Sequence, residues 1–294
     1  MSSAWRMARM YEIVDKKDLN AENTMLKVKA PQIASSCKAG QFIIVRANEK
    51  AERIPLTIAD WDSKEGWIQI IFQKVGASTY ELADYNKGDK LMDFVGPLGL
   101  PTHAEGAGKT VVIGGGLGIA IATPVARAYK QAGNHVDVII GARNSELLIL
   151  EKELDKIADN LYICTDDGSK GREGFVTEQL EELIKGGAEY KTCFTVGPPI
   201  MMMFVAKITE KYDLKTVVSL NSIMLDGTGM CGACRVSIGG EIKLACVDGP
   251  DFDGHLVDWE NLMHRLTAYK DEEREAMEEY QKKNECCNEK KDGA

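Results

Sequence analysis

The chain has 294 residues, of which 44% are hydrophobic and 28% are charged, and its formal net charge is -9. This length predicts two domains and an appendage, and the negative charge argues against a nucleic-acid partner, which would require a basic face. No apolar run reaches the ~18 residues of a membrane span, so we expect no membrane partner. The start of the chain lacks the apolar stretch of a signal peptide, and we therefore expect a cytoplasmic protein.

The first segment, residues 1–104, predicts an antiparallel β-barrel. Between residues 8 and 100, the short apolar runs MLKVKA, QFIIVRA, WIQIIFQKV and KLMDFVGPLG are separated by turn residues and charges. Short strands at such close spacing are typical of a small antiparallel barrel.

Two polar motifs lie within this predicted barrel. An Arg can meet a pyrophosphate, a Thr hydroxyl can bond a flavin ring nitrogen, and a turn at a helix N-terminus can hold a phosphate. Each motif is weak evidence by itself, because an Arg-x-Pro loop is more often structural. The candidates are Arg53, Pro55, Leu56 and Thr57 in the first motif, and Gly76, Ser78 and Thr79 in the second.

Residues 105–215 predict an α/β domain with a parallel sheet. The apolar strands VVIGG, VDVIIGA, LYICT and CFTVG alternate with helical stretches near 119–132, 146–158 and 176–187. This βαβ rhythm is typical of parallel sheets, which bind ligands beyond the carboxyl ends of their strands.

Three segments follow strand ends in this domain, and together they indicate a nucleotide crevice. Glycines let the backbone approach phosphates at a helix N-terminus. The alternative is a structural turn for the glycines and a solvated turn for the acidic segment. The candidates are Gly114, Gly115, Gly116 and Gly118, then Asp166, and then Gly197 and Pro198.

Residues 216–254 form a Gly- and Cys-rich module. Asp226, Cys231, Cys234 and Cys246 have the spacing D-x4-C-x2-C-x11-C. Plant-type [2Fe–2S] sites use C-x4-C-x2-C and a distant Cys, so the pattern fits if Asp226 stands where the first Cys would be. Glycines within the loop permit the positive φ values that turn N–H groups toward a cluster.

Other interpretations of this module remain open. Zinc is one, because C-x2-C is also a zinc spacing, although a second such pair is missing. Buried thiols beside a turn residue are another. Carboxylate is a hard ligand that is uncommon on iron–sulfur clusters, so Cys193 or a tail Cys is a substitute for Asp226. The pair Cys286–Cys287 has no ligand spacing.

Residues 255–294 predict a C-terminal helix and tail. The stretch 255–285 is amphipathic, and we expect the last segment, KKNECCNEKKDGA, to be frayed.

Taken in order, these motifs resemble the ferredoxin–NADP reductase superfamily over roughly residues 8–270. Gly40-Gln41-Phe42 and Gly96-Pro97-Leu98-Gly99 complete the set. The closest resemblance is to the branch with a C-terminal [2Fe–2S] domain. That branch includes the electron-transfer subunit of dihydroorotate dehydrogenase B, the small subunit of the electron-bifurcating NADH-dependent reduced ferredoxin:NADP oxidoreductase, and the sulfide dehydrogenase small subunit.

The resemblance implies FAD at the barrel, NAD(H) at the parallel sheet and a relay to the [2Fe–2S] cluster. It also implies a larger partner that carries a second FAD, two [4Fe–4S] clusters and the sites for NADP(H) and ferredoxin. Ile71, Phe72 and Gln73 are then expected near the flavin's ribityl or adenine part. Asp226 favours the bifurcating subunit over the dihydroorotate type, which uses four Cys; a standalone electron carrier is a third hypothesis.

Arg143 argues against the implied preference for NAD. It follows the strand VDVIIGA. An Arg at such a strand end favours a 2′-phosphate, and so NADP, whereas the resemblance implies NAD.

Overall fold

The computed structural model describes residues 10–292, with side chains to residue 283. The first domain is a seven-stranded, nearly closed antiparallel sheet in the order β6-β1-β2-β5-β4-β3-β7. Its elements are β1 (Tyr11–Asp18), β2 (Asn23–Lys29), α2 (Pro31–Ala34), β3 (Phe42–Arg46), β4 (Ile54–Asp62), β5 (Trp67–Gln73), α3 (Ala77–Asp84), β6 (Lys90–Leu91) and β7 (Asp93–Leu98). Alternating residues of these strands fill its core, as the predicted barrel requires.

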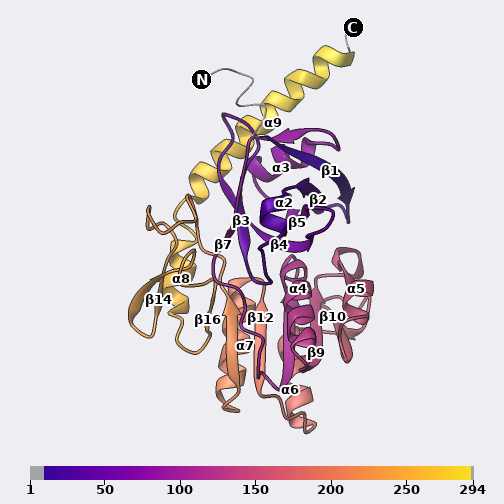
Figure 1. Cartoon of the computed structure of the whole chain (residues 1–294), viewed down its shortest axis with the longest axis vertical. Coiled ribbons are helices and arrows are strands. Elements are labelled where there is room, and N and C mark those ends of the chain that lie inside the picture. Colours follow the sequence, from indigo (N-terminus) through magenta and orange to yellow (C-terminus); the bar gives the residue numbers. More distant parts are fainter. Residues whose placement is uncertain (1–9, 293–294) are drawn as a thin grey trace.

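The second domain is an α/β sheet in the order β11-β10-β9-β8-β12-β13-β16, in which only β16 is antiparallel. Its elements are β8 (Lys109–Gly115), α4 (Gly118–Gln131), β9 (His135–Ala142), η1 (Ser145–Leu147), α5 (Glu151–Asp155), β10 (Asn160–Thr165), β11 (Arg172–Glu173), α6 (Val176–Lys185), β12 (Thr192–Val196), α7 (Pro199–Glu210), β13 (Lys215–Ser219) and β16 (Asp251–Asp253). The carboxyl ends of its parallel strands face the barrel (Figure 1). The predicted α/β domain with a parallel sheet is thus confirmed.

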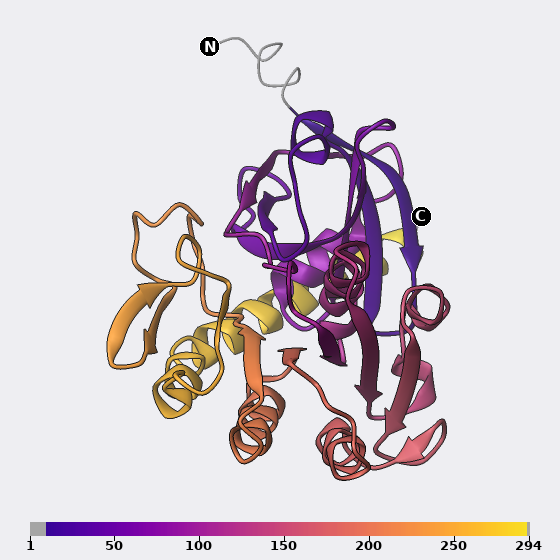
Figure 2. The same cartoon turned by 60° about the horizontal axis from the view of Figure 1, so that its bottom comes forward.

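The third module is the hairpin of β14 (Arg235–Ile238) and β15 (Glu241–Leu244), together with the loop before it and α8 (Trp259–Arg265). It lies beside the other two domains (Figure 2). The long helix α9 (Lys270–Asp292) then passes the barrel at α3, where the Tyr280 hydroxyl donates to Asp84 at 2.8 Å.

Shared cores hold the three parts together. One core joins Ile71 of the barrel to Ile119 and Tyr129 of α4. Another joins Phe42 and Ile44 of the barrel to residues of β13 and the third module. Because buried side chains from different parts pack in the same cores, packing fixes the relative positions of these parts.

The helices differ from the sequence-based expectations in three places. The stretch 146–158 is divided between the end of η1 and the short α5, because Leu150 takes a left-handed conformation with φ of 55° directly before α5. The stretch 255–285 is divided between α8 and α9. The helix α9 continues to Asp292, into the segment that was expected to be a tail; the side chains of Cys286 and Cys287 lie outside the described ones. The helix α7 was not predicted.

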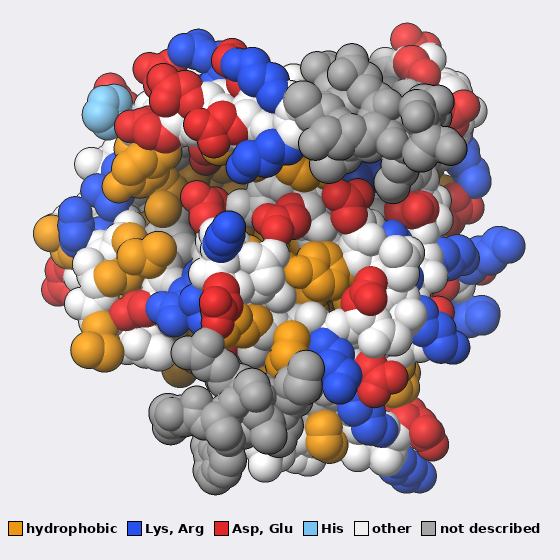
Figure 3. All heavy atoms as spheres, turned by 90° about the horizontal axis from the view of Figure 1, so that it is seen from above, with side chains coloured by type: hydrophobic (Ala, Val, Ile, Leu, Met, Phe, Trp, Pro, Cys, Tyr) orange, Lys and Arg blue, Asp and Glu red, His pale blue; other side chains and the backbone are white. Residues whose placement is uncertain are grey.

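In residues 10–292, no helix is both long and apolar enough to cross a bilayer. On the face seen in Figure 3, acidic and basic side chains are interspersed and do not form one large basic area.

A buried carboxyl group lies where the three parts meet. Thr102, in the connection between barrel and sheet, donates to Asp251 Oδ2 at 2.6 Å. Asp251 Oδ1 is shut off from solvent and has no hydrogen-bond partner among the described residues. Burial raises the pKa of Asp251 from 3.8 to about 6, although the Thr102 and Ser219 hydroxyls oppose the shift.

We expect Asp251→Asn to stabilise the protein at pH 8 by about 1–2 kcal/mol. The native state holds this proton more tightly than the unfolded state, so the contribution to stability is complete below pH ~4 and is lost as pH rises through about 6. Urea unfolding at pH 5 and pH 8 measures the effect. Between pH 5 and pH 8, Asp251→Asn should lose less free energy of unfolding than the native chain. The exposed control Glu260→Gln should lose as much as the native chain. Equal losses in Asp251→Asn and the native chain would contradict the prediction.

Candidate functional site

The cysteine loop places its four candidate ligands in two pairs. Cys234 Sγ and Cys246 Sγ lie 3.2 Å apart in the interior, where both thiols are buried. Asp226 Oδ1 and Cys231 Sγ lie 3.4 Å apart nearer the surface. The loop and the β14–β15 hairpin thus bring residues separated by up to twenty positions into one small region.

Backbone N–H groups of the loop point inward at Asp226. Its carboxylate accepts from the N–H groups of Thr228, Met230 and Cys231 at 3.1–3.2 Å. These hydrogen bonds, that of Thr228 first, lower the pKa of Asp226 below its ordinary value. The predicted positive φ values are also confirmed: Gly227, Gly229 and Gly232 have φ of 73°, 84° and 66°.

The two-pair arrangement fits a two-iron cluster better than a single ion. Among the described residues, no three His, Cys, Asp or Glu side chains converge on one metal position. A tetrahedral zinc ion needs such convergence, whereas each iron of a [2Fe–2S] cluster takes two protein ligands. Cys193 lies in a different core, on β12 among the sheet residues, which argues against it as the fourth ligand.

The loop packs directly on the barrel. A Cβ built on Gly227 would lie 2.7 Å from Leu98 Cδ1 and 3.0 Å from Ile44 Cγ1, and the φ of 73° also favours glycine at this close approach. Ile44 belongs to β3, which pairs with β4, the strand that directly follows Arg53 and carries the rest of its motif. Leu98 belongs to β7, on the other side of β3. The ligand loop and the predicted flavin face are therefore neighbours.

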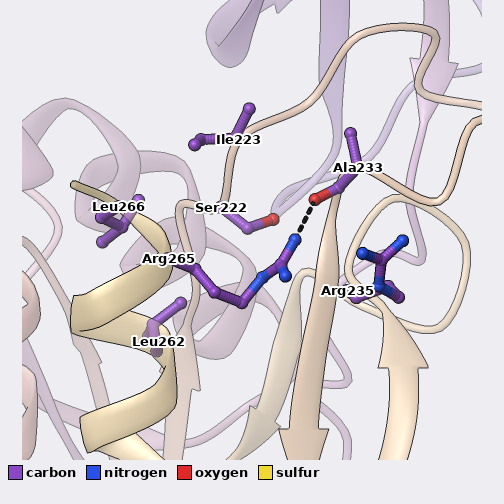
Figure 4. A pocket seen from close by; sticks show the side chains of 7 residues that line it. All are labelled: Ser222, Ile223, Ala233, Arg235, Leu262, Arg265 and Leu266. Carbon is purple, nitrogen blue, oxygen red and sulfur yellow. Dashed lines mark hydrogen bonds between the residues drawn. The ribbon is translucent and has the colours of Figure 1, made fainter. Parts of the chain in front are cut away.

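Two arginines that the sequence analysis missed donate hydrogen bonds to backbone carbonyls of the ligand loop, residues 226–234. Arg265 of α8 donates to the carbonyl of Ala233 at 3.0 Å, beside a small hollow that Ser222 also lines (Figure 4). Arg235 donates to the carbonyl of Gly232 at 2.7 Å. The only sequence signal for Arg235 is a positive charge next to C-x2-C, and Arg265 has none, because its contact spans 32 positions.

The barrel brings its two candidate flavin motifs together. Ser78, at the start of α3, donates to Glu52 at 2.8 Å, and Glu52 directly precedes Arg53. The Thr79 hydroxyl accepts from the N–H groups of Val75 and Gly76, so it caps the helix. Arg53 is exposed, and the other three residues of its motif, on β4, are half-buried. A basic side chain, a helix N-terminus and a partly apolar strand suit a dinucleotide.

The three predicted residues at the end of β5 differ in what they offer a ligand. Ile71 and Phe72 are buried in the cores, so they can reach a bound group only through their backbone. Gln73 instead donates to Glu22 Oε2 at 2.5 Å.

The glycine segments of the α/β domain meet at one edge. Gly114 and Gly115 end β8, and a Cβ on Gly197, after β12, would lie 2.9 Å from the Gly115 carbonyl oxygen. Gly116 has φ of 55° and open space beside it. This turn leads into α4, whose N-terminus faces the barrel, and the space and the free helix end suit a phosphate group. Pro198 starts α7 beside it.

Arg143 and Asp166 lie at the same edge. The N–H of Asp166 donates to the Ala142 carbonyl at 3.1 Å, which places Asp166 next to Arg143. The guanidinium of Arg143 forms an ion pair with Glu22, in the turn between β1 and β2 of the barrel. Glu22 was not among the predicted residues, because nothing in the local pattern marks a partner 121 positions away.

Two segments match known families. Residues 112–207 match the oxidoreductase NAD-binding domain, which includes the glycine turn. Residues 221–258 match the iron–sulfur cluster binding domain of dihydroorotate dehydrogenase B, which includes all four paired ligand candidates.

Near-full-length relatives extend these matches. The dihydroorotate dehydrogenase B (NAD(+)) electron transfer subunit homolog of Thermotoga maritima is 42% identical over 271 residues, which cover 92% of this chain and 95% of that protein. The chain belongs to this family. The electron transfer subunit of Desulforamulus reducens is 32% identical and covers 82% of this chain and 94% of its own length.

Solved structures agree with the family assignment. A chain of the NADH-dependent reduced ferredoxin-NADP oxidoreductase is 41% identical, with a TM-score of 0.88 over 92% of this chain and 98% of that one. Phthalate dioxygenase reductase is 16% identical, with a TM-score of 0.57 over 78% of this chain and 86% of its own, and shares the fold. The resemblance to the ferredoxin–NADP reductase superfamily, and to its branch with an iron–sulfur domain, is thereby confirmed.

Proposed function

We propose that this chain is the electron-transfer subunit of a flavin-based electron-bifurcating NADH-dependent ferredoxin:NADP oxidoreductase. The observation that carries the proposal is the paired loop, in which an aspartate replaces the first cysteine ligand and the backbone packs on the barrel. A close structural relative is the NADH-dependent reduced ferredoxin-NADP oxidoreductase, which supports this choice within the family.

The cofactors are FAD, NAD(H) and a [2Fe–2S] cluster. When bound, they supply hydride exchange between nicotinamide and flavin and single-electron transfer beyond it. The residues of the chain provide position and electrostatics: Arg53 and Ser78 hold the flavin's pyrophosphate, the turn at Gly116 receives the nucleotide phosphates, and Asp226 with the three cysteines holds the iron. No side chain is required as an acid or base for the hydride step.

The partner is a larger flavin and iron–sulfur subunit, which we place on the outer face of the ligand loop. Leu225, Met230 and Val247 are 57%, 88% and 40% exposed there, around the outer ligand pair. Exposed apolar groups beside a redox centre suit a protein interface, because they exclude water where electrons cross.

We expect Met230→Asp to weaken the complex about tenfold or more, because a charge in the centre of an apolar interface must be desolvated. Analytical ultracentrifugation of the two subunits measures this. Ile242→Asp, an exposed apolar residue on β15, is the matched control and should bind normally. Unchanged binding by Met230→Asp would move the interface away from this loop.

Anaerobic purification of the native complex tests the proposed function. A copurified partner with flavin and [4Fe–4S] clusters, and NADP(H) and ferredoxin activity, supports it. A dihydroorotate dehydrogenase or sulfide dehydrogenase partner would replace the proposal with one of those complexes. Purification without a partner, from cells that produce one, would favour a standalone electron carrier.

We also propose a cytoplasmic location. Six cysteines are free among the described residues, as a reducing compartment favours.

A further inference from the structure

The ion pair between Glu22 and Arg143 connects the two domains at the nucleotide edge. Arg143 is 67% exposed in its side chain and Glu22 is 33% exposed. Both carboxylate oxygens of Glu22 are engaged, one by Arg143 and the other by Gln73 of β5 at 2.5 Å. Contacts within the barrel therefore hold the Glu22 carboxylate in position beside Arg143.

The backbone around Glu22 is also held in place. Its N–H donates to Asn20 Oδ1 at 3.0 Å, and its carbonyl accepts from Lys74 N–H at 2.8 Å. Because both the main chain and the side chain of Glu22 have fixed partners, its carboxylate is held beside Arg143 with little further loss of conformational entropy.

The chemistry of this edge distinguishes the two nicotinamide nucleotides. A carboxylate suits the free 2′-hydroxyl of NAD(H), and an Arg suits the 2′-phosphate of NADP(H). Arg143 would provide that Arg if it were unpaired. Glu22 neutralises it, and Asp166 and Asp167 follow the neighbouring strand, with their N–H groups bonded to the carbonyls of Ala142 and Arg143. A dianionic 2′-phosphate would meet repulsion here.

We propose that Glu22 sets the preference of the nucleotide site for NAD(H) over NADP(H) by holding Arg143 in an ion pair across the two domains. The proposal rests on the nucleotide site of the proposed function. It explains how an Arg at the end of this strand is compatible with NAD, because the residue that sets the nucleotide preference, Glu22, lies in the barrel domain.

The test uses the full chain with its flavin and two probes, 5′-AMP and 2′,5′-ADP, titrated by calorimetry. Glu22→Gln keeps the shape of the side chain but frees Arg143, and it should bind 2′,5′-ADP about tenfold more tightly while 5′-AMP binding changes less than about twofold. Adding Arg143→Ala to this variant should remove the gain. NADPH-dependent dye reduction should rise in the same order.

A control distinguishes specificity from a merely structural connection. Asp60→Asn removes the other arginine–carboxylate pair between the domains, with Arg127 at 2.6 Å, and should leave the ratio of the two affinities unchanged. Two results would overturn the role of Glu22 but not the nucleotide site. In the first, Glu22→Gln changes the affinities for both probes equally. In the second, it changes neither affinity while the native chain binds 5′-AMP and NADH. Failure of the native chain to bind either molecule would overturn the nucleotide site as well.

Discussion

Cys246→Ser and Cys234→Ser are each expected to abolish electron transfer to the partner subunit, by ~100-fold or more, while NADH-dependent dye reduction persists. The two thiols lie 3.2 Å apart and form the proposed buried ligand pair, so the loss of either would leave one iron with a single thiolate. The flavin and nucleotide sites lie in other domains and should remain intact. Iron and acid-labile sulfide content, together with the electron paramagnetic resonance spectrum of the reduced protein, measure the loss.

Two further variants make this prediction specific. Cys193→Ala removes a buried thiol of the parallel sheet, and its cluster content should equal that of the native chain. Asp226→Cys should retain the cluster with a changed spectrum, because a softer thiolate replaces a carboxylate. A native spectrum in both Asp226→Cys and Asp226→Ala would remove Asp226 from the ligand set.

Local residue chemistry made the backbone conformation of the candidate site predictable from the sequence. The loop at Asp226–Cys234 is short, and its glycines need positive φ wherever the rest of the chain lies. The glycine turn after β8 is similar, since a strand, a turn and a helix start adjoin in sequence. The periods of apolar residues likewise predicted the barrel strands and α4 and α6.

Contacts between distant segments were not predictable in this way. Glu22 is an ordinary turn acid until the fold brings Arg143 to it, and Arg265 is an ordinary helix residue until α8 packs below Ala233. The missed helix α7 has a different cause. Its Pro-rich start and Met-rich first turns read as a ligand loop or a core segment, although Pro is well suited to the first turn of a helix.

Gly118→Ala is expected to destabilise the protein by about 2–4 kcal/mol and to weaken NADH binding at least about tenfold. Gly118 is the first residue of α4, and the helix there touches the end of β12. A Cβ on Gly118 would collide with the Val196 carbonyl oxygen and lie 2.8 Å from Gly197 Cα. These atoms are backbone, so no side-chain rotation relieves the overlap, and the helix must move away from the sheet.

Gly116→Ala provides the matched control for this prediction. Gly116 has φ of 55°, but a Cβ there would meet nothing within 4 Å, so its cost is about 1 kcal/mol of backbone strain. Urea unfolding of both variants compares the packing overlap with the backbone strain. NADH titration compares Gly118→Ala with the native chain, because the turn at Gly116 is itself the proposed phosphate site. If Gly118→Ala were no less stable than Gly116→Ala, close packing of α4 on β12 could not be the reason for glycine at position 118. A larger loss of stability in Gly118→Ala would instead show that the contact between α4 and the end of β12 sets the position of the helix N-terminus. The conformational freedom of the glycine turn would then not be the whole reason.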